Sequence, residues 1–413
     1  MSEALRAGYK LTEVGVIPEQ WRVFLLGDLF KFKNGLNKSK EYFGHGTPIV
    51  NYMDVYSKRG LSHREIKGLV DVTKAELKAY EVRKGDVFFT RTSETVDEVG
   101  ISSILLDDSA DTVFSGFVLR GRAQDTCLVD EYKKYCFASN GFRRQIIATS
   151  SYTTRALTNG RLLSAISMPV PPKPEQTAIA AALSNIDALL AKLNTLIAKK
   201  RYIKQATMQQ LLTGQTRLPG FSGEWEVKRV EEFGEVVTGG TPRTDVQEYW
   251  GEGFPWITPT DISIDRDMHT SERSITLSGL NSIRSLPKNT VLVTCIASIG
   301  KNAILKTEGA CNQQINAVIP NHDHCVEFLY YIFEVSKQYL QANAGTSATS
   351  MVSKAVFSKM NFLVPSLPEQ TAIAAVFSDM DTELAALETR RDKTQALKQG
   401  MMQELLTGKI RLV

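Results

Sequence analysis

The chain repeats itself, and this repeat limits the folds it can adopt more than any other feature of the sequence. The octapeptide Pro-Glu-Gln-Thr-Ala-Ile-Ala-Ala stands at residues 174–181 and again at 368–375. The offset of 194 holds without a gap from 174–218 to 368–412, where 25 of 45 aligned positions are identical. Chance does not produce such a match. We therefore expect two copies of one structural unit.

The segments that precede these repeats also match each other, but more weakly. The heptapeptide Tyr-Phe-Gly-His-Gly-Thr-Pro at 42–48 matches Tyr-Trp-Gly-Glu-Gly-Phe-Pro at 249–255, and Trp21 and Trp225 open the two units. Each unit is thus expected to hold a divergent domain followed by a near-identical arm. The last arm ends where a connector to the first domain would continue. The repeat is therefore circular, and we expect the two termini to lie close together.

The arms have the pattern of long amphipathic helices. A proline followed by Glu175 is typical of a helix start, and Gly214 and Gly408 stand where glycine commonly ends a helix. Between them, apolar residues recur at spacings of three and four, which is the seam of a coiled coil. The predicted seam that joins the two helices consists of Ile179, Leu183, Ile186, Leu190, Leu193, Ile197, Ile373, Phe377, Met380, Leu384 and Leu387.

The two arms place their charges differently. The first is basic toward its end, at Lys199, Lys200, Arg201 and Lys204, whereas the second carries acids earlier, at Glu383, Glu388 and Asp392, among Arg390, Arg391 and Lys393. Two such helices could pair antiparallel and form a rigid coiled-coil spacer with pseudo-twofold symmetry. The alternative is that each arm only closes its own domain, although a seam of this length rarely serves a single domain.

The predicted fold class is α+β, with two globular mixed domains that alternate with the two helices. Short strand-like runs, for example at 87–90, 113–119 and 291–294, are separated by turn residues. The predicted boundaries are an N-terminal segment at 1–20 that packs near the C-terminal arm, a first domain at 21–173, a first arm at 174–218, a second domain at 219–367 and a second arm at 368–413.

Composition and charge set loose limits on function. A net charge of +4 and a pI near 8.6 permit a nucleic-acid partner without demanding one. No apolar run approaches the roughly 20 residues of a membrane span, and the first residues lack the apolar core of a signal peptide. The five cysteines form no Cys-x-x-Cys pair, which fits free thiols in a reducing compartment. We expect a cytoplasmic protein.

Polar loops before each arm are candidates for contact with nucleic acid. Segments 149–155 and 345–350 are rich in serine and threonine, whose hydroxyl groups could reach phosphates or base edges. Basic residues lie near these segments and in other loops. A solvated surface group is the competing interpretation for each one. The candidate DNA-binding residues are Lys38, Lys40, Arg59, Arg64, Arg91, Arg143, Arg144, Thr154, Arg155, Arg243, Arg266, Arg273, Lys301, Thr349, Ser350 and Lys354.

Two divergent domains, arms that open with Pro-Glu-Gln and close with Leu-Leu-Thr-Gly, and a circular repeat resemble the DNA-specificity subunit of type I restriction–modification systems. The resemblance covers essentially the whole chain. It implies that each domain recognises one half of a bipartite double-stranded DNA target, while the arms set the spacing and dock two modification (methyltransferase) subunits. Restriction (translocase–nuclease) subunits would complete the enzyme. S-adenosylmethionine, ATP and Mg²⁺ would bind those partners, and this subunit would need no cofactor.

The sequence predicts no catalytic residue and no metal site. The glycine-rich cofactor loop and the Asn/Asp-Pro-Pro-aromatic motif of a methyltransferase are absent, and residues 237–242 are typical of a turn. Asp54 and Glu65 beside Lys67 could form a nuclease site, but the second copy has no counterpart. The His-Asp-His-Cys run at 322–325 lacks a fourth ligand, which favours a polar loop.

Three other functions stay open at this point. The domains could bind protein rather than DNA, which would make the chain a scaffold. The chain could be a fused methyltransferase–specificity enzyme, although the missing motifs argue against it. It could also serve a modification-only (orphan) methyltransferase, because the difference from a restriction system lies in the partners. Diverged domains on near-identical arms predict an asymmetric target and two equivalent docking surfaces.

Overall fold

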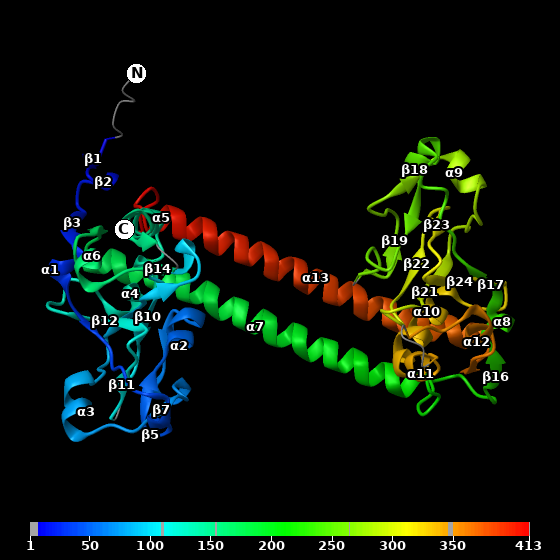
Figure 1. The fold of residues 1–413 in the computed structure, drawn as a ribbon, viewed down its shortest axis with the longest axis horizontal. Coiled ribbons are helices and arrows are strands. Elements are labelled where there is room, and N and C mark those ends of the chain that lie inside the picture. Colours follow the sequence, from blue (N-terminus) through cyan, green and yellow to red (C-terminus); the bar gives the residue numbers. More distant parts are fainter. Residues whose placement is uncertain (1–6, 109–110, 153–154, 264, 346–349, 413) are drawn as a thin grey trace. The chain divides into compact units, whose positions relative to one another are not determined.

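The computed structural model describes residues 7–108, 111–152, 155–263, 265–345 and 350–412. The chain forms two compact units, Met1–Asn194 with Arg390–Val413 and Thr195–Thr389. Two helices of 39 residues, α7 (Lys173–Leu211) and α13 (Leu367–Leu405), run from one unit into the other (Figure 1). Each unit therefore contains one globular domain, one half of α7 and one half of α13.

The first domain is built on a five-stranded sheet whose middle strand is buried on both faces. That strand, β8, reads Val-Phe-Phe-Thr and is the kind of continuous apolar run that a sheet covered on both sides requires. It pairs antiparallel with β12 and β10. The strands in spatial order are β4 (Phe30–Asn34), β12 (Val118–Ala123), β8 (Val87–Thr90), β10 (Ser102–Leu105) and β6 (Gly60–Leu61).

Smaller sheets and short helices surround this sheet. The smaller sheets are β11 (Val113–Phe114), β5 (Phe43–Val50) and β7 (Leu69–Val70); β13 (Ser151–Tyr152), β14 (Ala156–Leu157) and β9 (Thr92–Ser93); β1 (Tyr9–Thr12) with β2 (Gly15–Pro18); and β15 (Ser167–Val170) with β3 (Arg22–Leu25). The helices are α1 (Leu26–Leu29), α2 (Tyr52–Ser57), α3 (Lys74–Tyr80), α4 (Asp130–Cys136), α5 (Asn140–Thr149) and α6 (Gly160–Ser164), with 3-10 turns at Lys40–Tyr42, His63–Glu65 and Val96–Glu98.

The second domain repeats the five-stranded sheet, the β11–β5–β7 sheet and the β15–β3 pair of the first. Its five-stranded sheet runs β17 (Gly234–Thr238), β24 (Ile315–Pro320), β21 (Thr290–Thr294), β22 (Asn302–Leu305) and β19 (Asp267–Met268), beside β20 (Ser274–Ile275), β18 (Trp250–Ile257) and β23 (Ala310–Cys311), and β16 (Glu226–Arg229) with β25 (Asn361–Val364). Its helices are α8 (Val230–Phe233), α9 (Leu277–Asn281), α10 (Val326–Val335), α11 (Lys337–Ala342) and α12 (Lys354–Ser358), with a 3-10 turn at Gln247–Tyr249. The predicted α+β class is confirmed.

One strand expectation is wrong. The run at 113–119 is not a single strand, because Ser115, Gly116 and Phe117 turn the chain between β11 and β12. Gly116 lets the Asn37 side chain pack closely on this turn, since a Cβ there would stand 1.9 Å from the Asn37 side-chain oxygen. Periodicity alone does not reveal such a close approach.

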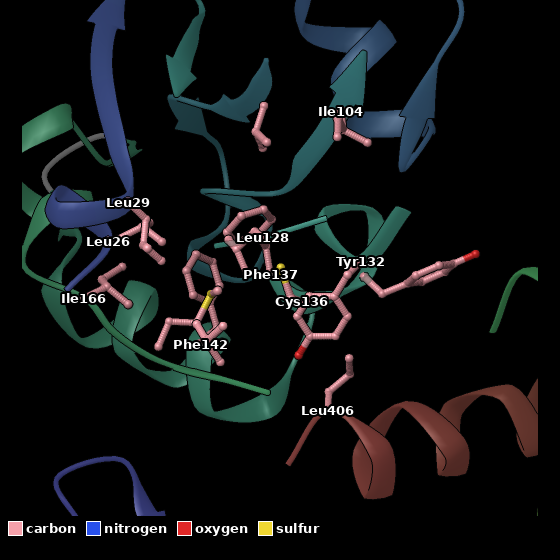
Figure 2. Packing of buried hydrophobic residues seen from close by; sticks show 14 of the residues in the cluster. Leu26, Leu29, Ile104, Leu128, Tyr132, Cys136, Phe137, Phe142, Ile166 and Leu406 are labelled. Carbon is pink, nitrogen blue, oxygen red and sulfur yellow. The ribbon is translucent and has the colours of Figure 1, made fainter. Parts of the chain in front are cut away.

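The core of the first unit takes residues from both long helices. Ile179 and Leu183 at the start of α7, together with Met402, Leu405 and Leu406 at the end of α13, belong to the same buried cluster as the domain's aromatic residues. Figure 2 shows Leu406 pointing from the end of α13 toward the aromatic residues of α4 and its neighbours. The start of one arm and the end of the other thus close the first domain.

The second unit is closed in the same way. Met208 and Leu211 from the end of α7 and Ile373 and Phe377 from the start of α13 lie in its main buried cluster. Each arm therefore closes the domain that it follows, as the alternative interpretation proposed, and also contributes its last turns to the other unit. Eight of the eleven predicted seam residues are buried, and the remaining three, Ile186, Met380 and Leu387, are half-buried.

Within each unit, the two arm segments run antiparallel. In the second unit Lys200 pairs with Glu383 at 2.7 Å and Lys204 pairs with Asp381, so residues later in α13 meet residues earlier in α7. These ion pairs join the basic end of the first arm to acids early in the second. The spacer is an antiparallel pair of helices.

Candidate nucleic-acid interface

Two of the predicted DNA-binding residues of the first domain are engaged inside the protein. Lys38 pairs with Glu76 at 2.9 Å. The Arg143 guanidinium donates hydrogen bonds to the carbonyl oxygens of Val99 and Asp97 at 2.8 and 2.7 Å, and burial lowers the pKa of Arg143. These donors are already used, so the two side chains serve the fold of the domain.

Arg59 and Arg91 are half-buried. Arg59 donates to the Met402 sulfur at 3.1 Å, and burial lowers its pKa. Arg91 donates to the carbonyl of Gly116 at 3.3 Å, whereas its buried Nε has no partner among the described residues. Both side chains point donors into the protein rather than toward solvent.

The other described candidates of the first domain lie on its surface. Arg155 is 3.9 Å from Glu94, and Arg144 donates only to the carbonyl of Asn140 in its own helix, at 3.4 Å. Such long contacts leave most of the guanidinium donors open to a ligand. The exposed candidates of this domain are Lys40, Arg64, Arg144 and Arg155. Thr154 lies outside the described residues.

In the second domain, Arg243 and Arg266 have acidic partners. Arg243 forms a two-pronged pair with Asp245 at 2.6 and 3.2 Å. Arg266 pairs with Asp267 at 2.9 Å and donates to the hydroxyl of Tyr331 at 2.9 Å. Burial alone would lower the pKa of Arg266, but the hydrogen bonds that it donates to Asp267 raise it.

Arg273 stands apart from these arginines. Its exposed guanidinium lies 3.8 Å from the ring centre of Trp250 and 5.3 Å from that of Trp256, and no acidic side chain of the described residues pairs with it. This aromatic support was not predicted from the sequence. The one feature of the sequence that pointed to aromatic residues here was the alignment of Tyr249-Trp250 with Tyr42-Phe43 in the matched heptapeptides. Lys301, Ser350 and Lys354 are also exposed, while Thr349 lies outside the described residues.

A set of contacts that recurs in both units ties each domain to both arms, and we call it the joint. In the first unit the Tyr135 hydroxyl donates to Asp187 at 2.7 Å, and Lys398 from the other arm pairs with the same carboxylate at 2.5 Å. Ser184 lies 3.0 Å from the Tyr135 hydroxyl. Burial would raise the pKa of Asp187, but hydrogen bonds from Lys398 and Tyr135 lower it.

The second unit has the same joint at equivalent positions. The Tyr331 hydroxyl donates to Asp381 at 2.7 Å, and Lys204 from the other arm pairs with that carboxylate. Arg266 reaches Ser378 at 2.8 Å here. Arg266 therefore works inside the joint rather than at a surface.

Each arm also begins with a buried glutamate, in a contact that we call the clasp. Glu175, 1% exposed, pairs with Arg411 at 2.5 Å and accepts from the Trp21 indole at 2.9 Å. Glu369, also 1% exposed, pairs with Arg217 at 2.5 Å. A buried carboxylate requires such a partner, because an unpaired charge would cost several kcal/mol.

The glutamine of the Pro-Glu-Gln motif binds the residue that precedes α4 in the first unit and α10 in the second. Gln176 accepts from the backbone N–H of Val129 at 2.9 Å, and Gln370 accepts from that of Cys325 at 3.0 Å. Both glutamines are buried. The repeated motif thus encodes attachment of each domain to its arm.

The N-terminal segment contacts the end of the second arm. The Tyr9 hydroxyl donates to the carbonyl of Gly408 at 2.9 Å. Gly408 has a φ of +72°, and a Cβ there would stand 3.2 Å from the Trp21 ring. Gly214 has the same φ and faces Trp225 in the second unit. The ends of the two arms thus meet equivalent tryptophans.

The His-Asp-His-Cys run forms a partly buried loop. His324 packs its ring 5.1 Å from that of Phe233 and shares a 2.8 Å hydrogen bond with Asn321. Burial lowers the pKa of His324. No group of three or more metal-ligating side chains occurs among the residues that the structure describes. Within the same described ranges, no helix is long and apolar enough to cross a membrane.

Comparison with known proteins identifies the family. The model of the type I restriction modification DNA specificity domain matches residues 18–200 and 222–399. The chain therefore belongs to the type I restriction–modification specificity subunits, which recognise DNA and are not the catalytic subunits.

The named relatives are specificity subunits as well. The chain is 34% identical to the MjaIX specificity subunit of Methanocaldococcus jannaschii over 42% of this chain and 41% of that relative. It is 21% identical to the putative MjaX specificity subunit of the same organism over 98% and 97%. It is 29% identical to the EcoR124I/EcoR124II specificity subunit of Escherichia coli over 60% of each chain. The first of these matches thus spans less than half of its relative.

Solved structures share the fold. The S subunit of the type I restriction–modification system from M. genitalium has a TM-score of 0.57 at 16% identity, covering 96% of this chain and 97% of that one. A chain from a structure on complex assembly and conformational transition of the type I system has a TM-score of 0.59 at 16% identity, covering 95% and 99%. The likeness covers both domains and both arms.

Proposed function

We propose that this chain reads an asymmetric bipartite DNA target, with one half recognised by the domain at 21–173 and the other by the domain at 219–367. The observation that carries the proposal is the contrast between joint and surface. Joints and clasps repeat in both units, whereas the surface that holds Arg273 in one domain has Gly68 at the matching position in the other. A shared scaffold with unlike surfaces suits two unlike half-sites.

The proposed DNA interface consists of side chains whose polar groups are not consumed within the protein. Phosphate contacts would position the domains, and contacts to base edges would specify the sequence. The residues that we assign to it are Lys40, Arg64, Arg144, Arg155, Arg273, Lys301, Ser350 and Lys354. The other described candidates, Lys38, Arg59, Arg91, Arg143, Arg243 and Arg266, spend donors on protein groups.

The arms at 174–218 and 368–413 would set the spacing between half-sites and dock two copies of one modification subunit. Identity at 25 of 45 positions supports two equivalent docking surfaces. Restriction subunits would join the same assembly, and S-adenosylmethionine, ATP and Mg²⁺ would bind to those partners. Relatives named as restriction-enzyme subunits support this complete system over a modification-only one.

Exchange of one domain tests the proposal. The chain is co-expressed with its modification partner, and methylated positions are mapped across a genome. Replacing residues 21–165 by those of a relative should change one half-site and leave the other half-site and the gap intact. Replacing residues 225–360 should change only the opposite half. A change in both halves after a single exchange would contradict the proposal, as would a methylated site without two parts.

A further inference from the structure

The free end of the second domain carries an arginine on an aromatic support. β18 and α9 lie at the end of this domain away from α10, α11 and α12 (Figure 1). Trp250 and Trp256 come from β18, and Arg273 directly precedes β20, the strand that pairs with it. Arg273 is exposed at this end of the domain.

The two indole rings are held in place by hydrogen bonds. Trp256 donates from Nε1 to the carbonyl of Gly240 at 2.9 Å, and Trp250 donates to that of Arg243 at 3.2 Å. The rings meet edge to face at 5.1 Å and 89°. Trp256 is 5% exposed, so it anchors the more exposed Trp250 to the core. The support is rigid.

The backbone that carries Arg273 is fixed as well. Its carbonyl accepts from the backbone N–H of Trp256 at 3.2 Å and from the Ser271 hydroxyl at 2.6 Å. The neighbouring Glu272 N–H donates to Asp261 at 2.7 Å. Hydrogen bonds thus fix the backbone of Arg273, and contact with the indole rings positions its guanidinium.

The contact with the rings leaves the guanidinium donors of Arg273 unused. A guanidinium carries its N–H donors in its own plane, where they can bind two acceptors at once. No described side chain accepts from Arg273, whereas neighbouring Arg243 is occupied by Asp245 at 2.6 Å. The protein therefore leaves the donors of Arg273 available and has neutralised the arginine beside it.

The first domain lacks this device. Register with Phe254–Ile275 and Thr47–Val70 places Gly68 where the second domain has Arg273. Lys38, which donates to the carbonyl of Asp71 just after β7, is paired with Glu76 at 2.9 Å. The device is specific to one half of the molecule, as a base contact of one half-site would be.

We propose that Arg273 reads a guanine in the half-site of the second domain, by donating two hydrogen bonds to its O6 and N7 atoms in the major groove. This inference rests on the proposed function. A phosphate could also accept two hydrogen bonds, but contacts to phosphate need no fixed plane. A base edge has one orientation, and an arginine whose guanidinium is held 3.8 Å from the centre of the Trp250 ring is suited to it.

The test uses the full chain in complex with its modification subunits. The methylation map of the wild-type complex first defines both half-sites. In Arg273→Ala, one G·C position of one half-site should become degenerate, with discrimination there reduced roughly 5- to 150-fold. The other half-site and the gap should not change. Unchanged preference at every G·C position would overturn the inference.

Two further variants separate a base contact from a phosphate contact. Arg273→Lys keeps the charge but loses the fork, so discrimination at the same position should still fall. Wild-type discrimination in this variant would overturn the inference in favour of a point-charge contact. Arg243→Ala, beside the same rings, is the matched control and should leave the map unchanged. Relaxation of the same position by Arg243→Ala would also overturn the assignment.

Direct binding keeps the test decisive where methylation becomes too weak to map. The purified complex is titrated with the mapped target and with duplexes altered at single G·C pairs of that half-site. The wild-type complex should lose affinity on one altered duplex, and Arg273→Ala should bind it and the target equally. Uniform weakening on all duplexes would show a phosphate contact and overturn the inference. Absence of any bipartite target in the wild-type map would instead contradict the proposed function.

Discussion

In the first unit the buried glutamate of the clasp has two donors, whereas in the second it has one. Glu175 receives both Arg411 and the Trp21 indole, while the buried indole N–H of Trp225 has no partner among the described residues. The ion pairs between the two arms, in contrast, are more numerous in the second unit. Lys200 and Arg201 pair with Glu383 and Glu388 in the second unit. The equivalent positions of the first unit hold Thr394, Gln395, Leu189 and Asn194.

This comparison separates what the repeat must keep from what it can vary. The joint aspartate with its tyrosine and lysine, and the clasp glutamate with its arginine, occur in both units. Indole donation and the extra ion pairs occur in one only. The shared contacts attach each domain to its arms. The unshared contacts change the free energy of unfolding of one unit only.

The largest effect is expected from breaking the clasp. Arg217→Ala and Arg411→Ala should each destabilise their own unit by about 3–5 kcal/mol, because a carboxylate stays buried without its cation. Arg217→Ala should cost more, since Glu369 has no indole donor. Hydrogen exchange followed by mass spectrometry reports the two units separately. Arg229→Ala, at an exposed pair with Glu231, is the control. Equal losses for both clasps would contradict the comparison.

A smaller effect should separate the two tryptophans. Trp21→Phe removes a hydrogen bond to a charged group, which contributes about 1.5–3 kcal/mol. Trp225→Phe removes only an unpartnered N–H and should cost less. A double-mutant cycle with Glu175→Gln, followed by urea unfolding, isolates the hydrogen bond from the packing of the ring. A coupling energy near zero would show that the indole donor does not strengthen the clasp.

The extra ion pairs of the second unit should contribute less again. Lys200→Ala and Arg201→Ala should each cost about 0.2–1 kcal/mol, because both pairs are partly exposed to solvent. The loss should vanish in high salt, which screens such pairs. Lys199→Ala, one residue earlier and exposed, should change nothing at any salt concentration. Thermal unfolding at two ionic strengths measures both effects.

The smallest expected effect is on the stability of the first unit at acidic pH. The pKa of Asp187 is lowered in the folded protein from its ordinary 3.8. Its stabilising contribution is therefore complete above pH 3.8 and is lost as the pH falls through the lower, folded value. Asp187→Asn should flatten the acid limb of the stability curve of the first unit alone. Protection from hydrogen exchange, measured from pH 5 downward, would detect this. An unchanged acid limb would place the sensitivity elsewhere.

The arms were predictable from sequence because their signal is local and repeated. Spacings of three and four located the seam, and two repeated seams of this length indicated a helix pair. Strands such as Val87–Thr90 were equally visible as apolar runs between turn residues. The division of the chain into domains at the predicted boundaries stays a prediction.

The individual basic residues were not predictable, because charge alone does not tell a surface group from a structural one. Arg266 looked like a DNA contact, yet its partners Tyr331 and Ser378 are 65 and 112 residues away. A signal did exist, since Tyr135 and Tyr331 fall on the same helix face in both copies. Aromatic support of Arg273 depends on a register between β18 and β20 that the sequence does not display.

Closure of the first domain by the end of the second arm has a consequence for biosynthesis. Arg411 follows Glu175, its partner, by 236 residues. At about 5–20 residues per second, that stretch takes a ribosome roughly 10–50 s to make. Throughout this time the first domain exposes the apolar surface that Met402, Leu405 and Leu406 will cover. The second domain, whose α7 segment is already made, waits only for the start of α13. The half that is translated first is thus completed last. A chaperone of nascent chains would bind the apolar surface that the first domain exposes during this time.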